Sequence, residues 1–337
     1  MSRTASPTRY ARYARALVFL CLMALLMMVI GCGPRDREAG QSLAAAGGKT
    51  AETMAAYYDS LAVDADRQPD LEIFYRHVNS LPDFGSGDQQ ILARQAASLR
   101  HRAAMCRSLE AIYAALGKLS SYDSSKEVKQ SVDGLTGSLK QITSEPPQLF
   151  GTSASSVVTP IINGLVTWRQ SSDIDKAAAT VRPTLDGIRI LLAGETPAYL
   201  LITRRHYVLI GGDHPPAPTH ATTGVAEHLL QSQSMNLQFF LTDVPEVQGL
   251  PWSDAPVQDT MTKDAMQRVL NAQLSRLETK SEATPSQLGD ALQALATQHD
   301  KFAQKQQLTL ETVLSYQEQA QTYIDLLTKL RGVSPKQ

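Results

Sequence analysis

Apolar residues recur at alternating steps of four and three over much of this chain. Two series in the first half follow the spacing closely, one on each side of a short polar turn: Met105, Leu109, Ile112, Leu116 and Leu119, then Val128, Val132, Leu135, Leu139 and Ile142. This spacing places the side chains of each series on one face of a helix. Two such helices joined by a short turn predict an antiparallel helical hairpin.

The same period predicts helices through most of the remaining chain. A short helix is expected over residues 161–168, and a longer one over 174–210 with an interruption or kink near Pro197. Two short strands, 199–202 and 207–210, are the alternative for its end, but no other segment offers strands that would cover them. We therefore predict an all-α fold, an elongated antiparallel bundle of about seven to nine helices.

The last third of the chain carries further helix predictions. Helices are expected near 223–241, 257–280 and 285–331, the last with Thr284 as N-cap and Pro285 at its first position. Apolar and aromatic residues of this last helix fall at multiples of seven: Leu288, Leu295, Phe302, Tyr316, Tyr323 and Leu330. This series predicts a coiled-coil-like partner face, broken or bent near the Gln-rich patch at 304–307.

Composition divides the chain into five segments. Residues 1–31 form a basic and apolar leader, and residues 32–49 are small, polar and Gly-rich, which predicts a flexible tether. A first part of the helical bundle is expected over residues 50–210 and a second over 225–332, packed on the first. The Pro- and Gly-rich residues 211–224 between them predict a loop or hinge.

The leader ends in Val29-Ile30-Gly31-Cys32, after an apolar run that begins at Ala16 and that four arginines precede. This combination resembles the signal peptide of bacterial lipoproteins, whose lipobox closes on an invariant cysteine. The resemblance covers residues 1–32 only. It implies cleavage before Cys32, a diacylglycerol on the Cys32 sulfur and a third acyl chain on its amine. Two or more acyl chains hold a protein stably on a membrane.

A transmembrane anchor and an ordinary secretory signal are the alternatives for the leader. The 15 residues of the apolar run span about 22 Å, short of the roughly 30 Å hydrocarbon core. A secretory site needs small residues at two positions before the cut, and the leader ends with only one, Gly31. The lipoprotein resemblance implies a location on a bacterial membrane, facing the periplasm or the cell surface. Gly33 stands where Asp would signal inner-membrane retention, which favours the outer membrane if there is one.

Cleavage before Cys32 would remove four of the 32 Lys and Arg residues and none of the 33 Asp and Glu residues. The remaining chain would be mildly acidic, which argues against a nucleic acid partner, because phosphates attract basic surfaces. Of the three cysteines, only Cys106 would remain as a free thiol. We therefore expect no disulfide and interpret Cys106 as a small buried hydrophobe.

Motifs for catalysis, metals and nucleotides are weak throughout the chain. The nearest metal candidate is Asp213, His214 and His220 on the Pro-rich loop, a composition more typical of a solvent-exposed spacer. Residues 48–50, Gly-Lys-Thr, match only the end of a phosphate-binding loop, and no apolar strand precedes them. We predict no catalytic residue, no metal, no cofactor and no nucleotide.

One charge cluster beside the predicted core is the candidate for a partner contact. It contains Glu195, Arg204, Arg205 and His206. Arg204 and Arg205 would receive an acidic group of a partner, because guanidinium groups bind carboxylates through two parallel hydrogen bonds. Ion pairs within the bundle, such as Glu195 with Arg204, or a solvated face are the alternatives.

The sequence thus favours a structural or protein-interaction role in the cell envelope over an enzyme. The expected partners are a membrane, through the lipid anchor, and an envelope protein. The alternative is a lipoprotein that binds a small molecule or a lipid between its helices, where four glycines would leave room: Gly134, Gly137, Gly164 and Gly187.

Overall fold

A computed structural model describes residues 34–119, 125–146, 149–150, 154–169, 174–211, 224 and 260–330. These residues form seven helices and no strand. In chain order the helices are α2 (Pro34–Val78), α3 (Ser86–Leu119), α4 (Ser125–Thr143), α5 (Ser155–Arg169), α6 (Ile174–Gly211), α10 (Thr260–Ala303) and α11 (Glu311–Leu330). The predicted all-α fold is confirmed, and residues 199–210 are helical rather than stranded.

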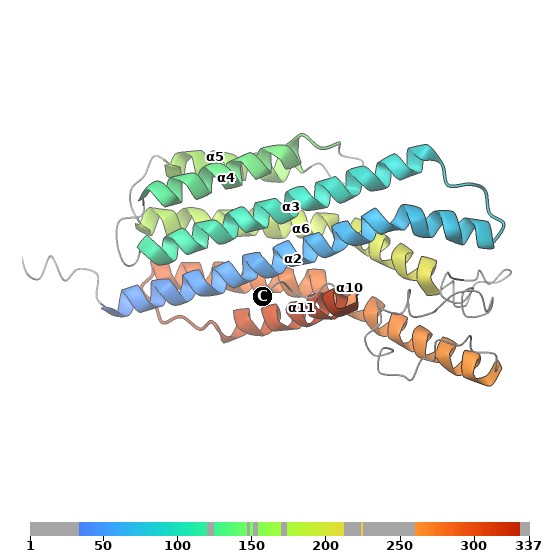
Figure 1. The fold of residues 1–337 in the computed structure, drawn as a ribbon. Helices are drawn as coiled ribbons and strands as arrows, with labels where there is room; N and C mark the ends of the chain where they lie inside the picture. Colours follow the sequence, from blue (N-terminus) through green and yellow to red (C-terminus); the bar gives the residue numbers. More distant parts are fainter. Residues whose placement is uncertain are drawn as a thin grey trace, which may run out of the picture.

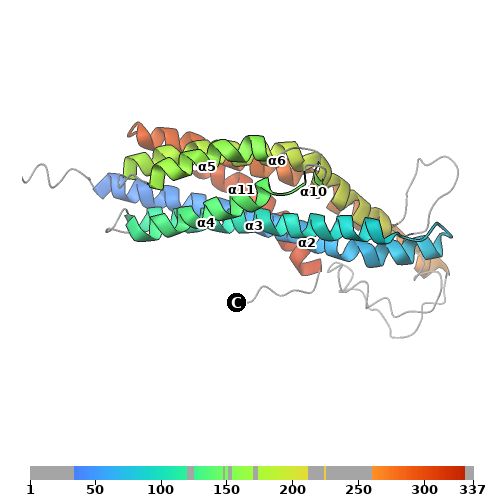
Figure 2. The same cartoon turned by 90° about the horizontal axis from the view of Figure 1, so that it is seen from above.

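The helices run side by side in an elongated bundle, with α4 and α5 along one side and α10 and α11 along the other (Figures 1 and 2). Helices α2, α3 and α6 lie between these two pairs. α3 packs on α4, which confirms the predicted hairpin, and α10 packs on both α6 and α2. No helix in the described part of the chain combines the length and the apolar content that a membrane span requires.

α2 is the central helix of the bundle, because it contacts α3, α6, α10 and α11. Its buried apolar residues therefore point in several directions: Ala51, Met54, Ala55, Tyr57, Tyr58, Leu61, Ala62 and Ala65. A helix that is buried on several sides has no single apolar stripe. The core consequently forms around α2, with Tyr57 and Tyr58 among its largest fully buried side chains.

The prediction of a flexible tether over residues 32–49 is wrong from residue 34 onward, because α2 begins at Pro34. Leu43 and Ala46 are buried in the core. Gly47 lies so close to α3 that an added Cβ would come within 2.1 Å of the ring of Tyr113. The small residues that suggested flexibility instead let another helix pack closely. Residues 48–50 accordingly lie within a helix and not in a phosphate-binding loop.

The predicted helix start at Thr284 and Pro285 is also wrong, because α10 continues through both residues. The Oγ1 atom of Thr284 donates to the carbonyl of Lys280 at 2.8 Å, a bond within the helix rather than an N-cap. The chain reverses later, over residues 304–310, where Lys305 has a φ of 56°. α10 has buried residues both before and after Pro285, which explains why the helix does not end there.

The heptad series of the last third lies on two different helices. Leu288 and Leu295 on α10 and Tyr323 on α11 are buried in the core of the bundle, and Phe302 packs against that core. α10 and α11 also pack on each other. The predicted break near residues 304–307 is confirmed, because α10 ends at Ala303 and α11 begins at Glu311. The partner face itself is covered by helices of the same chain and not by a separate partner.

Candidate functional site

Two charged residues occupy core positions in the middle of the bundle. Arg102 on α3 is 1% exposed and Glu195 on α6 is 0% exposed. The guanidinium Nε of Arg102 donates to Glu195 Oε2 at 2.7 Å, and its Nη2 donates to Oε1 at 2.5 Å. The Nη1 atom donates to the carbonyl of Ser98 at 2.9 Å and to Glu145 Oε2 at 2.7 Å. Every nitrogen of the guanidinium thus has an oxygen partner.

Aromatic side chains surround this ion pair. The hydroxyl of Tyr199 donates to Glu195, and the guanidinium carbon of Arg102 lies 4.4 Å from the ring centroid of Phe150. Phe150 and Tyr199 meet edge to face, with ring centroids 5.4 Å apart. We call Arg102, Glu145, Glu195, Tyr199 and Phe150 the core network. It joins α3, α6 and the segment between α4 and α5.

The electrostatics of the core network favour fixed charges. Although burial disfavours the charged guanidinium, Tyr199, Glu195 and Glu145 raise the pKa of Arg102 well above its ordinary value. Burial raises the pKa of Tyr199 well above its ordinary value. The arginine therefore stays charged and the phenol stays protonated at neutral pH. Such a network fixes the position of α3 against α6.

The core network was not predicted from the sequence, although the sequence carries a signal for it. Arg102 precedes Met105 by three residues, so it continues the apolar seam of α3 by one step. Glu195 follows Leu192 by three residues and continues the seam of α6 in the same way. A charged residue at a seam position on each of two helices predicts a buried pair, because an unpaired charge in the core is costly.

A groove opens on the surface beside the core network. Within α6, Pro197 has no N–H for the carbonyl of Ala193, and α6 changes direction in its second half (Figures 1 and 2). The groove has a volume of about 470 Å³ and is lined by Gln68, Gln95, Leu149, Phe150, Pro197, Ala198, Leu201 and Ile202. We call it the Phe150 groove, since Phe150 belongs both to its lining and to the core network.

Two glutamines fix the walls of the Phe150 groove. The buried Gln68 on α2 donates from Nε2 to the carbonyl of Ile202 at 2.6 Å. Gln95 on α3 donates from Nε2 to the carbonyl of Leu149 at 3.2 Å. Leu201, by contrast, is 67% exposed. The groove therefore combines fixed apolar walls with one large apolar side chain that is open to solvent.

The two predicted contact residues Arg204 and Arg205 bind carboxylates of the chain itself. Arg204 Nε donates to Glu282 Oε1 at 3.0 Å, on the exposed surface. Arg205 donates to both carboxylate oxygens of the buried Glu72, from Nε at 2.5 Å and from Nη2 at 2.8 Å. The alternative of ion pairs within the bundle therefore describes this cluster, but the specific pair of Glu195 with Arg204 is wrong, because Glu195 binds Arg102.

Other residues from the sequence analysis are placed as follows. Cys106 is buried in the core, as predicted, and burial raises the pKa of its thiol. Cys32 and the candidate metal residues Asp213, His214 and His220 lie outside the described residues. Among the residues that are described, no three His, Cys, Asp or Glu side chains lie close enough to hold a metal ion.

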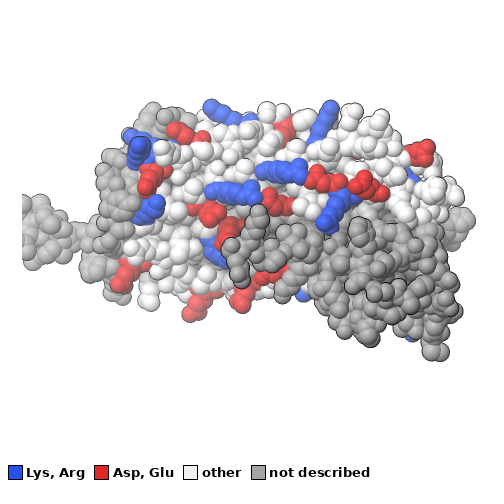
Figure 3. Space-filling model, in the orientation of Figure 1, with Lys and Arg blue, Asp and Glu red and all other residues white. Residues whose placement is uncertain are grey.

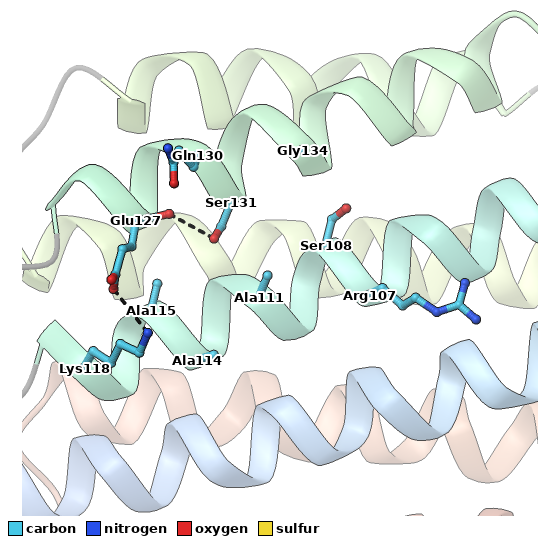
Figure 4. A pocket seen from close by; sticks show the side chains of 10 residues that line it. All are labelled: Arg107, Ser108, Ala111, Ala114, Ala115, Lys118, Glu127, Gln130, Ser131 and Gly134. Carbon is cyan, nitrogen blue, oxygen red and sulfur yellow. Dashed lines mark hydrogen bonds and ion pairs between the residues drawn. The ribbon is translucent and has the colours of Figure 1, made fainter. Parts of the chain in front are cut away.

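Three of the four glycines suggested for ligand binding border grooves, namely Gly134, Gly164 and Gly187. Figure 4 shows the groove of about 520 Å³ between α3 and α4 that Gly134 lines, where small side chains such as Ala111 and Ser131 project. The ion pair of Lys118 with Glu127, at 3.5 Å, lies at one end. Gly187 leaves no room for a ligand at its own position, because a Cβ there would lie 2.3 Å from Ile161 Cδ1.

Comparisons with known proteins do not add to this description. Scans against protein-family models, curated proteins and solved structures found no significant match to this chain. The functional argument therefore depends on the residues, the fold and the surfaces described above.

Proposed function

We propose that this chain is a lipid-anchored helical module of the bacterial cell envelope, held on a membrane through Cys32 and engaged in protein contacts there. The observation that carries the proposal is the direct connection between Cys32 and the bundle. α2 begins at Pro34, two residues after the cysteine, and runs to Val78 through the centre of the fold. A lipid at Cys32 would therefore be attached to a rigid body and not to a loose tail.

The length of α2 sets how far the proposed module extends. Its 45 residues extend over about 68 Å, since an α-helix rises about 1.5 Å per residue. A triacylated cysteine would hold such a body permanently on a bilayer. The module would then present its long faces at fixed distances from the membrane, which suits a structural or interaction role.

The Phe150 groove is the surface that we assign to the protein contact. Apolar anchors that insert into a preformed groove contribute most of the binding energy in many interfaces. The exposed Leu201 offers such a contact, beside a wall that includes the largely buried Phe150. The partner we expect is an envelope protein that presents an apolar side chain to this groove.

A small apolar ligand is the second candidate for this groove. Its volume of about 470 Å³ falls within the range of about 300–1,000 Å³ that is usual for small-molecule sites. Native mass spectrometry of detergent-extracted protein distinguishes the candidates. A bound small molecule that is lost in Leu201→Asp would favour the ligand over the protein partner.

Photo-crosslinking in intact cells tests the proposed function. A photoreactive residue at position 201 would report on the groove, and one at Ile190, which is exposed elsewhere on α6, serves as the matched control. We expect one protein adduct from position 201 that is absent from position 190 and from Cys32→Ser cells, where the protein should leave the membrane fraction. Recovery of the uncrosslinked chain alone from both positions would contradict the protein-interaction role.

A further inference from the structure

We infer that one end of the bundle faces the lipid surface and that the bundle stands end-on upon it. This end, which we call the turn end, holds the start of α2 beside the last residues of α3, α5 and α10 and the first residues of α4 and α6 (Figures 1 and 2). The inference rests on the proposed lipid anchor at Cys32 and adds to it the surface that contacts the membrane.

The first step is the reach of the anchor. Only Gly33 lies between Cys32 and Pro34, the first residue of α2. Two residues of fully extended chain span at most about 7 Å. A lipid on Cys32 would therefore hold the beginning of α2 within a few ångströms of the bilayer, with no linker long enough to carry the bundle away from it.

The second step is the arrangement of the helices. α3, α5 and α10 end at the turn end, and α4, α6 and α11 begin near it, so the described helices share this boundary (Figure 1). α2 runs along the long axis of the bundle from the same end. Anchoring the start of α2 thus brings these helix ends to the membrane together and directs the opposite end of the bundle away from it.

The third step is the chemistry of the turn end. Its exposed side chains are polar, and many carry amines or amides, which donate hydrogen bonds to the phosphate and carbonyl oxygens of lipid headgroups. These are Lys126 at the start of α4, and Gln304, Lys305, Gln306 and Gln307 in the turn between α10 and α11, while Glu38 and Glu311 are exposed carboxylates at the same end. Such side chains suit contact with headgroups rather than insertion between acyl chains.

The fourth step concerns the long sides of the bundle. Figure 3 shows Lys and Arg interspersed with Asp and Glu over one long face. Exposed ion pairs join α2 and α3, namely Asp59 with Arg107 and Asp66 with Arg100. Paired charges of both signs offer little net attraction to a charged lipid surface. Electrostatics therefore give this side no reason to lie flat on the membrane.

Contact quenching by lipid headgroups tests the inference on the full, lipidated chain in vesicles. A fluorophore is placed at Gln306→Cys in the turn end, or at Asp83→Cys in the connection between α2 and α3 at the opposite end. The 34 residues of α3 separate the two ends by about 51 Å. The native Cys106 is buried and should not react. Spin-labelled phosphocholine headgroups are the quencher.

We expect the quencher to remove most of the fluorescence at position 306 and to leave position 83 unchanged. A Gly-Ser linker of about 20 residues inserted between Gly33 and Pro34, with an r.m.s. length of about 25 Å, should abolish most of the difference. Equal quenching at both positions in a chain whose acylation is verified by mass would overturn the end-on arrangement alone. A chain without acylation would instead contradict the proposed function.

Discussion

Arg102 is tolerated in the core because its charge is matched there by Glu195 and Glu145. Removal of one partner from a buried ion pair leaves a charge that has lost both water and its counterion. The core network therefore makes the position of α3 against α6 depend on a few specific contacts. Its contribution to stability is best measured by comparing single and paired substitutions.

Glu195→Ala should lower the free energy of unfolding by about 3–5 kcal/mol, because it leaves the buried charge of Arg102 with Glu145 as its remaining carboxylate partner. The double variant Arg102→Met with Glu195→Leu should be less destabilised than this single variant, since it removes both fully buried charges and leaves Glu145 with His101 as its partner. Glu282→Ala, which removes the exposed partner of Arg204, is the control, and exposed pairs contribute roughly 0–1 kcal/mol. Urea unfolding measures all three. Equal effects of Glu195→Ala and Glu282→Ala would refute this account of the core network.

His299 on α10 predicts a pH dependence of stability. Its Nε2 lies 2.8 Å from the hydroxyl of Tyr113 on α3, and burial lowers its pKa from 6.5 to about 4, against the opposing effect of Asp300. Between these pH values the unfolded chain binds a proton that the folded chain does not. Stability should therefore fall as the pH falls from about 6.5 to 4, by about 3 kcal/mol at roughly 1.4 kcal/mol per pKa unit.

Unfolding midpoints at pH 7 and pH 4.5 check this prediction in the native chain and in His299→Gln. Glutamine retains a hydrogen-bonding group for Tyr113 but does not titrate. We expect the loss of stability between the two pH values to be smaller in the variant. If both chains lose the same stability, the acid sensitivity comes from groups other than His299.

At the scale of the elements, the start of α2 offers a matched pair of substitutions. Gly47→Ala would place a Cβ within 2.1 Å of the Tyr113 ring and should cost about 1–3 kcal/mol through overpacking. Gly48→Ala meets only an ordinary contact of 3.9 Å and should stabilise the helix by up to about 1 kcal/mol. Thermal unfolding followed by circular dichroism distinguishes them. Two neutral substitutions would indicate that residues 34–48 form the tether that composition suggested.

The elements that could be predicted from the sequence are those with a regular apolar spacing. α3 and α4 each carry an unbroken four-three series, so this spacing located both helices and the hairpin between them, although α3 also packs on α2. The beginning of α2 could not be located in this way, because a central helix made of small residues has the composition of a linker. Pro285 led to a wrong prediction of a helix start for a related reason. Proline at a first helical position is a local sequence signal, whereas the packing of α10 before and after Pro285 keeps the helix continuous.

The candidate site was less predictable than the fold. Periodicity can place Arg102 and Glu195 on seams, but which carboxylate meets which guanidinium depends on the relative rotation and height of α3 and α6. The Phe150 groove depends in addition on the bend at Pro197 and on the segment that carries Leu149 and Phe150. Neither is encoded in a spacing pattern, so both required the arrangement of the helices in space.

At the scale of the whole molecule, both halves of the described chain share one core. α10 packs on α6 and α2, and α11 packs on α2, so the last helices complete the bundle that the first ones begin. The same central helix starts two residues after the cysteine of the lipobox-like sequence. In the proposed function, α2 is therefore both the central helix of the core and the helix through which the bundle is attached to the membrane.

Mass spectrometry of the N-terminal peptide, taken from protein extracted from its native membrane, tests this proposal most directly. The account predicts a tryptic peptide Cys32–Arg35 that begins at the cysteine and carries the mass of a diacylglycerol thioether and an N-linked acyl chain. An unmodified Cys32, or a chain that still contains residues 1–31, would contradict it.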